Sequence, residues 1–386
     1  QLVNEIKTEY HACSIEKIPG TVGAQHDKDD TDGPVDKSGG SSWFTCGLYE
    51  LNESASTRQG AIVVFDENGD SRETLAMPSG VTDMKWSGIP GRRRLACALS
   101  AAELFVVLEP NDDHRAAAGP LGQLAQYDQF QVSDVSSGLF LSVDWDDRLS
   151  PSADPRVCVS TQSGGFQVYD FTPTGDLLLH QAMPTAHALT GVASGVEAPA
   201  WIVAFDPHSR TRLVSGGDDA RMLLWDLRMP LEEGAIATIR HHQMGVTTAQ
   251  WHPRHEHVFA SGSYDESVRI YDDRSLRRPV AELETGGGIW RVKWDDNDPS
   301  FLSAACMHAG AALLRFDESA GALSEVCRQR GASEEHLAYG VDVLRSGADA
   351  RGWMLASCSF YDNLVQVWSV EGTTPPISGP PSANGR

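Results

Sequence analysis

The feature of this sequence that most constrains its fold is a short apolar run ending in an aromatic or bulky residue and then an acidic one. This ending recurs along the chain, and a last run ends at Trp368 without the acid: Phe65-Asp66, Leu108-Glu109, Tyr169-Asp170, Trp225-Asp226, Tyr271-Asp272, Phe316-Asp317 and Trp368. Successive endings lie 43, 61, 56, 46, 45 and 52 residues apart. A period of this size predicts a repeat protein in which each unit packs mainly against its neighbours.

A second pattern, offset from the first, indicates the innermost strand of each unit. An apolar residue, any residue and a bulky apolar residue occur at Met84–Trp86, Val143–Trp145, Val203–Phe205, Ala249–Trp251, Val292–Trp294 and Val341–Val343. Alternation with a period of two is typical of strands that have one more deeply buried face. These six triplets would be the inner strands of units two to seven, and the seven endings of the first pattern predict an all-β protein with the architecture of a seven-bladed β-propeller.

The unit around residues 242–272 identifies the repeat type. His242 lies four residues before an expected inner strand, Val246–Trp251, and a turn at Asp265 leads into a strand that ends at Tyr271. This unit resembles a WD repeat closely, with Tyr271 in place of the usual tryptophan. The resemblance implies that the aspartate six residues before the strand aromatic bonds the backbone and a loop histidine. We therefore expect a structural role for Asp219, Asp265 and Asp362.

The same resemblance predicts how the ring closes. WD propellers pair an N-terminal strand with the last blade, which removes a free sheet edge. Residues 1–8 are the candidate for that strand, and an inner strand is expected near His11–Glu16. We expect residues 1–370 to form one propeller domain. Residues 21–42, rich in Asp, Gly, Lys and Ser, are a predicted disordered insertion, and residues 371–386 are a predicted disordered tail.

Composition argues against several classes of protein. Hydrophobic residues make up 41% of the 386 positions, and no apolar run reaches the ~18 residues typical of a membrane span. The net charge of −22 repels nucleic-acid phosphates and favours basic protein surfaces or cationic ligands. Seven scattered cysteines without C-x-x-C spacing fit a reducing compartment. We expect a cytoplasmic protein that binds neither membrane nor nucleic acid and, without a coiled-coil signal, is monomeric.

Common catalytic and nucleotide-binding motifs do not occur. The chain lacks G-x-S-x-G, G-x-x-x-x-G-K-[ST], G-x-G-x-x-G and H-E-x-x-H. Five histidines are close in sequence, but the expected strand Val246–Trp251 puts two of them at one end of a blade and three at the other: His241 and His242, then His252, His255 and His257. Zinc needs ligands that converge. We therefore predict neither a metal site nor a cofactor.

Several strings depart from the general WD pattern. The most specific are Gly287–Arg291, Ala305–His308 and Cys358–Asp362, and the others are Ala200–Phe205, Ser215–Asp219, Arg240–Val246, Gly262–Asp265 and Tyr339–Asp342. Together they look like the diphthine methylesterase family, the WD-repeat hydrolases of the diphthamide pathway. The resemblance covers residues 140–370, with weaker echoes in Thr45–Tyr49 and Thr82–Trp86.

This resemblance implies a reaction and a partner. Members of the family remove a methyl ester from the over-methylated diphthine on the modified histidine of translation elongation factor 2. The products are diphthine and methanol. The expected activity is that of a carboxylic ester hydrolase, and its substrate carries a trimethylammonium group beside the ester.

Residues for binding this substrate are expected on one rim of the propeller. The turns between the second and third strands of a blade share that rim with the loops that enter the first strands, so a pocket is expected at the channel mouth. Aromatic faces attract quaternary ammonium groups by ~0.5–2 kcal/mol per contact. The candidates are the rings Trp290, Tyr264, Tyr339 and Tyr361, the acids Glu197 and Asp218, and the basic residues Arg291 and His242. Packing between blades is the alternative role of each ring. Arg291 is a candidate to hold the carboxyl group of the substrate or an acidic patch of the partner, and a charge at a strand edge is its alternative role.

Ester hydrolysis needs an activated water or a nucleophile. His308 and His187 are the candidate general bases. Cys306 lies two residues before His308, so in an extended strand both side chains would point to the same face as a Cys–His pair. A buried inert thiol is the alternative role of Cys306. We expect water attack assisted by a histidine.

Two non-catalytic functions also fit the sequence, because a fold alone does not assign an activity. The first is a WD-repeat scaffold that binds partners through its rim. The second is a reader of methylated lysine or arginine, which would use the same aromatic residues without hydrolysis.

Overall fold

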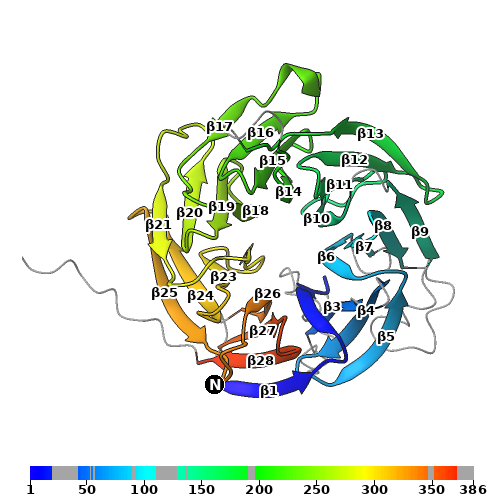
Figure 1. Ribbon diagram of the computed structural model, residues 1–386. Coiled ribbons are helices and arrows are strands. Elements are labelled where there is room, and N and C mark those ends of the chain that lie inside the picture. Colours follow the sequence, from blue (N-terminus) through cyan, green and yellow to red (C-terminus); the bar gives the residue numbers. More distant parts are fainter. Residues whose placement is uncertain are drawn as a thin grey trace, which may run out of the picture.

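The computed structural model describes residues 1–19, 42–52, 54, 57–88, 93–109, 128–134, 138–189, 196–346 and 352–371. These residues form seven four-stranded antiparallel sheets arranged as blades around a central axis (Figure 1). A short 3-10 turn, Leu231–Glu233, follows the third strand of blade 4. The predicted seven-bladed all-β propeller is confirmed.

The strands follow each other along the chain from the axis outward within each blade. Blades 1 to 3 contain β2 (His11–Lys17), β3 (Trp43–Asn52), β4 (Thr57–Asp66), β5 (Ser71–Met77); β6 (Val81–Ser87), β7 (Arg94–Leu99), β8 (Glu103–Leu108), β9 (Asp128–Ser133); and β10 (Phe140–Trp145), β11 (Arg156–Thr161), β12 (Phe166–Phe171), β13 (Leu177–Met183). Blades 4 to 6 contain β14 (Ala200–Phe205), β15 (Arg212–Gly217), β16 (Met222–Asp226), β17 (Ala237–Ile239); β18 (Val246–Trp251), β19 (Val258–Ser263), β20 (Ser267–Asp272), β21 (Ala281–Glu284); and β22 (Arg291–Trp294), β23 (Phe301–Ala305), β24 (Ala311–Asp317), β25 (Ala322–Gln329). Blade 7 contains β26 (Ala338–Arg345), β27 (Trp353–Ser359), β28 (Leu364–Val370) and β1 (Leu2–Lys7).

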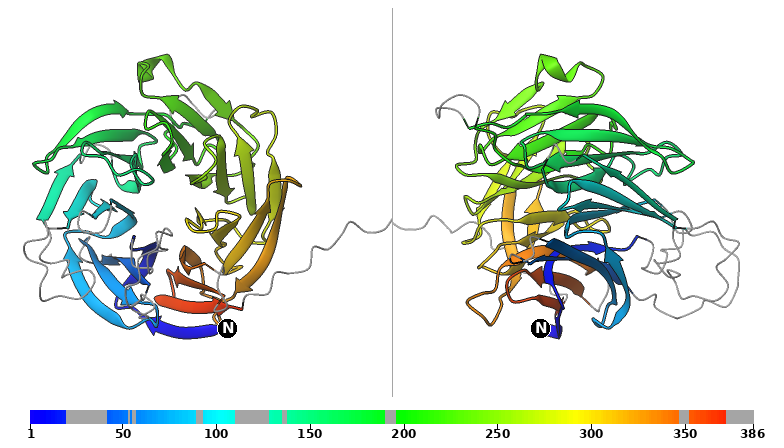
Figure 2. Two further views of the ribbon diagram at one scale, coloured as in Figure 1. Left: turned by 180° about the vertical axis from the view of Figure 1, so that it is seen from behind. Right: turned by 45° about the vertical axis from the view of Figure 1, so that its right-hand side comes forward.

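The predicted closure of the ring is also confirmed. The N-terminal strand β1 pairs antiparallel with β28, so that Leu2 lies opposite Trp368 and Lys7 opposite Leu364. Figure 2 shows this N-terminal strand on the outer edge of the last blade. Because β1 pairs with β28, blade 7 has four strands, as every other blade has.

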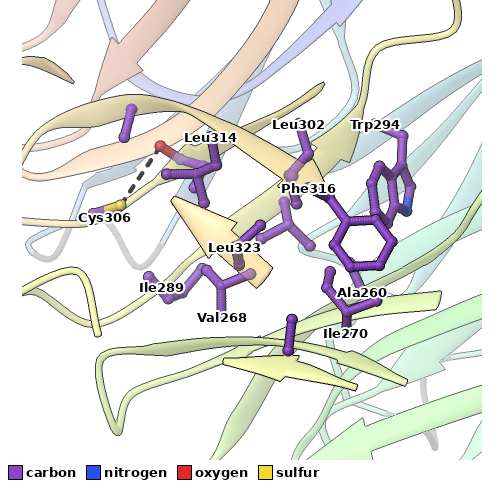
Figure 3. Packing of buried hydrophobic residues seen from close by; sticks show 14 of the residues in the cluster. Ala260, Val268, Ile270, Ile289, Trp294, Leu302, Cys306, Leu314, Phe316 and Leu323 are labelled. Atoms are coloured by element: carbon purple, nitrogen blue, oxygen red, sulfur yellow. Dashed lines mark hydrogen bonds between the residues drawn. The ribbon is translucent and has the colours of Figure 1, made fainter. Parts of the chain in front are cut away.

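Burial falls from the axis to the rim. The inner strand β18 is buried along its whole length, whereas three successive residues of the outer strand β13 are exposed. Both faces of an inner strand such as β18 are therefore buried, because neighbouring blades cover both faces. Between blades 5 and 6, for example, Ala260 and Ile270 pack with Trp294 and Leu314 (Figure 3).

The central channel has two ends that differ in chemistry. We call the end where the inner strands begin the upper mouth, and the end where they finish the lower mouth. The insertion predicted at 21–42 and the tail predicted at 371–386 lie outside the described residues, apart from Ser42 and Glu371. Within the described residues no helix is long and apolar enough to cross a membrane. All seven cysteines are free thiols.

Candidate functional site

A cavity of about 160 Å³ opens at the upper mouth of the channel. All seven inner strands contribute to its wall near their first residues, and β3, the loops before β10 and β22 and a turn of blade 7 complete it. The lining residues are Cys13, Tyr49, Thr82, Leu139, Leu141, Trp201, Thr247, Trp290, Arg291, Tyr339 and Phe360. The predicted pocket at the channel mouth therefore corresponds to a cavity with a mainly aromatic and aliphatic wall.

Trp290 lies at the centre of the aromatic part of this wall. Its ring centroid is 4.4 Å from that of Tyr339, 5.6 Å from Trp201 and 6.1 Å from Tyr264. These separations are in the range of favourable aromatic contacts. Three of the four rings predicted from the sequence are thus brought together, and Trp201 is a member of the group that the prediction missed.

Two glycines allow the loop of Trp290 to approach the neighbouring turn of blade 6. A Cβ atom at Gly287 would lie 2.3 Å from the carbonyl oxygen of Cys306, and one at Gly288 would lie 2.9 Å from the sulfur of Met307. Real Cβ atoms do not approach other atoms so closely, so a side chain at Gly287 would move the loop away from the backbone of blade 6, and one at Gly288 would displace the side chain of Met307. The Gly-Gly pair therefore helps to fix the place of Trp290 in the wall.

A carboxylate accompanies these rings. The indole nitrogen of Trp201 donates a hydrogen bond to Oδ1 of Asp218 at 3.1 Å, while the Asp218 residue remains exposed. Burial and the nearby charge of Asp218 raise the pKa of the Tyr264 hydroxyl. The upper mouth thus combines aromatic faces with a negative charge, which is the combination that attracts an organic cation.

The other two predicted groups of this rim lie differently. Tyr361 is 56% exposed in the turn between β27 and β28, where its ring contacts Phe360 at a centroid distance of 5.0 Å. Glu197 is exposed in the loop before β14 and forms an isolated β-bridge with Ala188. Tyr361 therefore borders the aromatic group, whereas Glu197 is not among the residues that line the cavity.

Arg291 forms the polar part of the wall, and an acid from another blade holds it. Nη2 of Arg291 lies 3.1 Å from Oδ1 of Asp83, which belongs to β6 and is fully buried. Nη1 of Arg291 is buried and has no hydrogen-bond partner. The prediction named Arg291 but missed Asp83, which lies in one of the weaker echoes of the family pattern.

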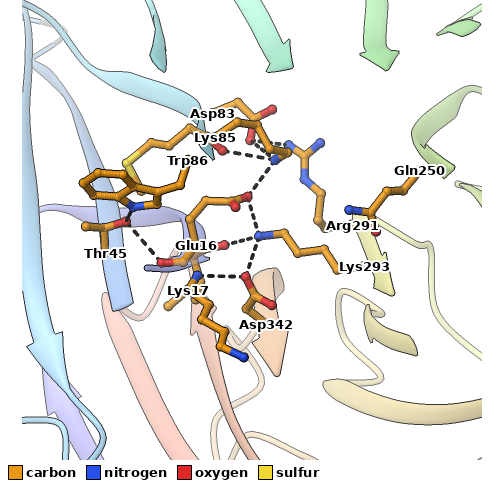
Figure 4. A network of polar contacts seen from close by, with 12 residues as sticks. Glu16, Lys17, Thr45, Asp83, Lys85, Trp86, Gln250, Arg291, Lys293 and Asp342 are labelled. Atoms are coloured by element: carbon orange, nitrogen blue, oxygen red, sulfur yellow. Dashed lines mark hydrogen bonds and ion pairs between the residues drawn. The ribbon is translucent and has the colours of Figure 1, made fainter. Parts of the chain in front are cut away.

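Below Arg291 a chain of ion pairs links the inner strands across the channel (Figure 4). Asp83 lies 3.4 Å from Lys85, Lys85 lies 2.7 Å from Glu16, and Glu16 also pairs with Lys293. Lys293 lies in turn 3.1 Å from Asp342. Burial alone would raise the pKa of Glu16, but the charges of Lys293 and Lys85 outweigh it and lower this pKa to about 2. In this chain each charge faces an opposite one.

His187 and His242 lie away from the cavity, and each belongs to the hydrogen-bond network of its WD repeat, in which a loop histidine contacts the aspartate of the turn and a strand serine. Nδ1 of His187 lies 2.9 Å from Asp219 and its Nε2 lies 2.9 Å from the hydroxyl of Ser215. In blade 5, His242 contacts Asp265 at 3.0 Å and Ser261 at 2.7 Å, and burial lowers the pKa of His242. Both nitrogens of each ring are engaged. We therefore correct the assignment of His187 as a base and of His242 as a substrate ligand.

The structure does not form the expected Cys–His pair. Strand β23 ends at Ala305, and Met307 has a left-handed φ of +43°, so residues 306–309 turn instead of continuing extended. Cys306 is fully buried in the core between blades 5 and 6 (Figure 3), where burial raises its thiol pKa. His308 is exposed at the centre of the turn between β23 and β24, the place that Asp265 has in blade 5. Cys306 is thus buried, as its alternative role as a structural thiol predicts.

A histidine that the sequence interpretation did not select lies beside the cavity. Nδ1 of His11 is 2.9 Å from the carbonyl oxygen of Phe360, and the two rings stack with centroids 4.4 Å apart. A neutral ring held in this way donates from Nδ1 and keeps the lone pair on Nε2. In the sequence, His11 was distinguished only by its position at the start of an expected inner strand.

The histidines of blade 5 do not converge. His241 and His242 precede β18, and His252, His255 and His257 follow it at the lower rim. Within the described residues, no group of three or more His, Cys, Asp or Glu side chains is arranged to hold a metal ion.

Comparison with known proteins agrees with this architecture. Residues 187–226 and 234–272, in blades 4 and 5, match the family model described as WD domain, G-beta repeat. A crystal structure of the mitotic checkpoint complex contains a chain with a TM-score of 0.59 at 13% identity, which covers 85% of this chain and 86% of that one. At this identity the likeness concerns the fold alone.

Curated relatives match most of the sequence. Human diphthine methyltransferase is 29% identical over 91% of this chain and 77% of its own length. The diphthine methyltransferase homolog of Dictyostelium discoideum is 28% identical over 84% of this chain and 92% of its own, and the Schizosaccharomyces pombe diphthine methyltransferase is 25% identical over 88% and 96%. This chain is therefore a WD-repeat β-propeller protein that resembles the diphthine methyltransferases over most of its length.

Proposed function

We propose that this protein hydrolyses the methyl ester of methylated diphthine on translation elongation factor 2 and releases diphthine and methanol. The names of its relatives supply the diphthine substrate class. The observation that carries the proposal is the aromatic cavity at the upper mouth, with Asp218 bonded to one of its rings. The strings Gly287–Arg291 and Cys358–Asp362, which carry the esterase resemblance, contain Trp290 and Phe360 of its wall.

The cavity suits the trimethylammonium group of this substrate. Trp201 and Trp290 face the cavity, and each aromatic contact with such a cation contributes ~0.5–2 kcal/mol depending on desolvation. Asp218 adds a charge of opposite sign at the same place. The open upper mouth lets a side chain enter while the protein that carries it stays outside.

The reaction needs a base that removes a proton from water. Water adds to the ester carbonyl carbon, the bond from that carbon to the methoxy oxygen breaks, and methanol, a carboxylate and a proton result. We assign the base to His11, because Phe360 both lines the cavity and holds the Nδ1 proton of His11, so that Nε2 is left as the acceptor. His308, exposed in the turn of blade 6, is the competing candidate.

Mass spectrometry of the substrate protein tests the reaction. Elongation factor 2 carrying methylated diphthine is incubated with the protein, with and without a methyl donor such as S-adenosylmethionine. Hydrolysis lowers the substrate mass by one methylene group and releases methanol without the donor. Methylated diphthine has no site left for another methyl group, so methyl transfer is tested on elongation factor 2 that carries diphthine without the ester. A donor-dependent gain of one methylene there would establish the methyl transfer that the relatives' names describe. Unchanged masses of both substrate proteins would contradict both reactions and favour a scaffold or a reader of methylated residues.

Single substitutions then test the choice of base. General bases contribute typically 10²–10⁴-fold to a rate, so His11→Ala should lower kcat by about that factor. We expect a much smaller loss in His308→Ala, and choline affinity measured by calorimetry reports whether each cavity is intact. A large loss in His308→Ala alone would move the role to His308, and normal rates in both variants would contradict a histidine mechanism.

A further inference from the structure

One nitrogen of the Arg291 guanidinium is buried without a partner. The side chain is only 7% exposed, Nη2 pairs with Asp83, and Nη1 has no hydrogen-bond acceptor. A buried charged donor without an acceptor costs about 1–3 kcal/mol or more. Because Arg291 lies in the wall of a cavity, a ligand in that cavity is a possible source of the missing acceptor.

No side chain that lines the cavity is an anion that could pair with this donor. The hydroxyl of Thr82 donates to the carbonyl oxygens of Ala98 and Phe140, and the hydroxyl of Thr247 donates to the carbonyl oxygens of Gly262 and Ile289. The remaining lining side chains, apart from Arg291 itself, are aliphatic or aromatic or carry the thiol of Cys13, and the hydroxyls of Tyr49 and Tyr339 are neutral. The wall therefore contains a cationic donor and no anion of its own.

Asp83 fixes the direction of this donor. Its Oδ2 accepts the backbone N–H of Val143 at 3.2 Å, and its Oδ1 lies 3.4 Å from Lys85. Held from two sides, Asp83 pairs with one edge of the guanidinium beside Lys85 (Figure 4). Asp83 thus acts as a positioning residue for Arg291, and Nη1 of this lining residue is left without an acceptor from the protein.

We propose that the cavity binds quaternary-ammonium carboxylates, with the cation among the rings beside Asp218 and the carboxylate on Nη1 of Arg291. A carboxylate forms a charge-assisted bond with a guanidinium, whereas an ester or a hydroxyl offers only a neutral oxygen. The biological ligand of this class would be the product diphthine, and this part of the inference rests on the proposed function. Ester hydrolysis converts an uncharged ester group beside the trimethylammonium cation into a carboxylate, which gives a zwitterion. The product then binds more tightly than the ester and inhibits turnover.

Calorimetry with two small probes tests this binding without any reaction. Glycine betaine and choline carry the same trimethylammonium group, but only betaine has a carboxylate. Because bonds to charged groups contribute more than neutral ones, we expect the full-length protein to bind betaine at least about 10-fold more tightly than choline. In Arg291→Met the preference disappears and choline affinity stays within about 2-fold.

A second variant keeps the test valid if the first one unfolds. Asp83→Asn combined with Arg291→Met leaves no unpaired carboxylate behind, and thermal unfolding reports whether each variant is folded. The preference for betaine should be absent from this double variant as well. Equal affinities in the wild type, no binding of either probe, or a preference that persists in both variants overturns the inference.

The outcome is separable from that of the proposed function. Hydrolysis of methylated diphthine without a preference for betaine removes this inference and leaves the esterase proposal standing. A preference for betaine in a protein that hydrolyses nothing supports the binding site and removes the esterase proposal.

Discussion

The two ends of the central channel are built from the same seven inner strands but have different chemistry. At the upper mouth, Trp201 and Trp290 line a cavity beside an arginine that has a free nitrogen. Toward the lower mouth, Glu16, Lys85, Lys293 and Asp342 each face an opposite charge (Figure 4). Satisfied charges hold strands together, and unsatisfied groups are available to a ligand. This difference supports a structural role for the lower half of the channel and the proposed binding site at the upper mouth.

Removing one charge from the lower half should have the largest effect. In Lys293→Met, Asp342 loses its buried partner, and breaking a buried pair costs about 3–5 kcal/mol. We expect the free energy of unfolding, measured with urea, to fall by this amount. Choline affinity of the folded variant should be unchanged, because Lys293 does not line the upper cavity.

The matched control removes both charges of that pair. Lys293→Met combined with Asp342→Asn leaves Glu16 paired with Lys85, so much of the lost stability should return. A single variant as stable as the wild type would show that these ions are not structural, and a loss of choline affinity would show that the two halves are not separate.

Substituting the central ring of the upper mouth should have a smaller effect on a different quantity. Trp290→Ala removes a cation–π contact that can contribute about 2 kcal/mol when desolvated, so choline affinity should fall by about 10-fold or more. Trp290→Phe keeps a ring and should retain most of the affinity. Unchanged binding in Trp290→Ala would move the cation site away from this wall.

A pH effect at the lower rim should be smaller still. Nδ1 of His252 accepts the backbone N–H groups of Arg254 and His255, and its Nε2 donates to the carbonyl oxygen of Pro299. Burial, and then the neighbouring His255, lower the pKa of His252 from 6.5 to about 4. The unfolded chain therefore binds the proton first, and stability present above pH 6.5 is lost as the pH falls through 4.

Urea unfolding at pH 7 and pH 5 checks this sign. Between the two values the wild type should lose on the order of 1 kcal/mol more than His252→Asn, which does not titrate. Choline affinity should differ little between the two proteins, because His252 lies at the other end of the channel from the cavity. Equal pH dependence in both proteins would contradict a neutral buried His252.

The sequence predicted the parts of this molecule that depend on local patterns. The inner strands, the pairing of residues 1–8 with the last blade and the group of Trp290 with Tyr264 and Tyr339 follow from repeat spacing and from strings that depart from it. The predicted pairing of Cys306 with His308 is wrong because Met307 adopts a left-handed conformation that ends the extended segment.

Contacts between distant segments were beyond these patterns. Asp83 and Arg291 come from blades 2 and 6 and meet only across the closed ring. His187 looked like a free base because the WD network of blade 4 becomes visible only when Asp219 and Ser215 are placed around it.

A crystal structure of the protein with bound choline is the measurement that tests the division of the channel most directly. The account predicts the trimethylammonium group at the upper mouth, within about 6 Å of the ring centroids of Trp201 and Trp290. Choline bound instead at the lower mouth, where Glu16, Lys293 and Asp342 line a second cavity of about 220 Å³, would contradict the assignment of binding to one end and structure to the other.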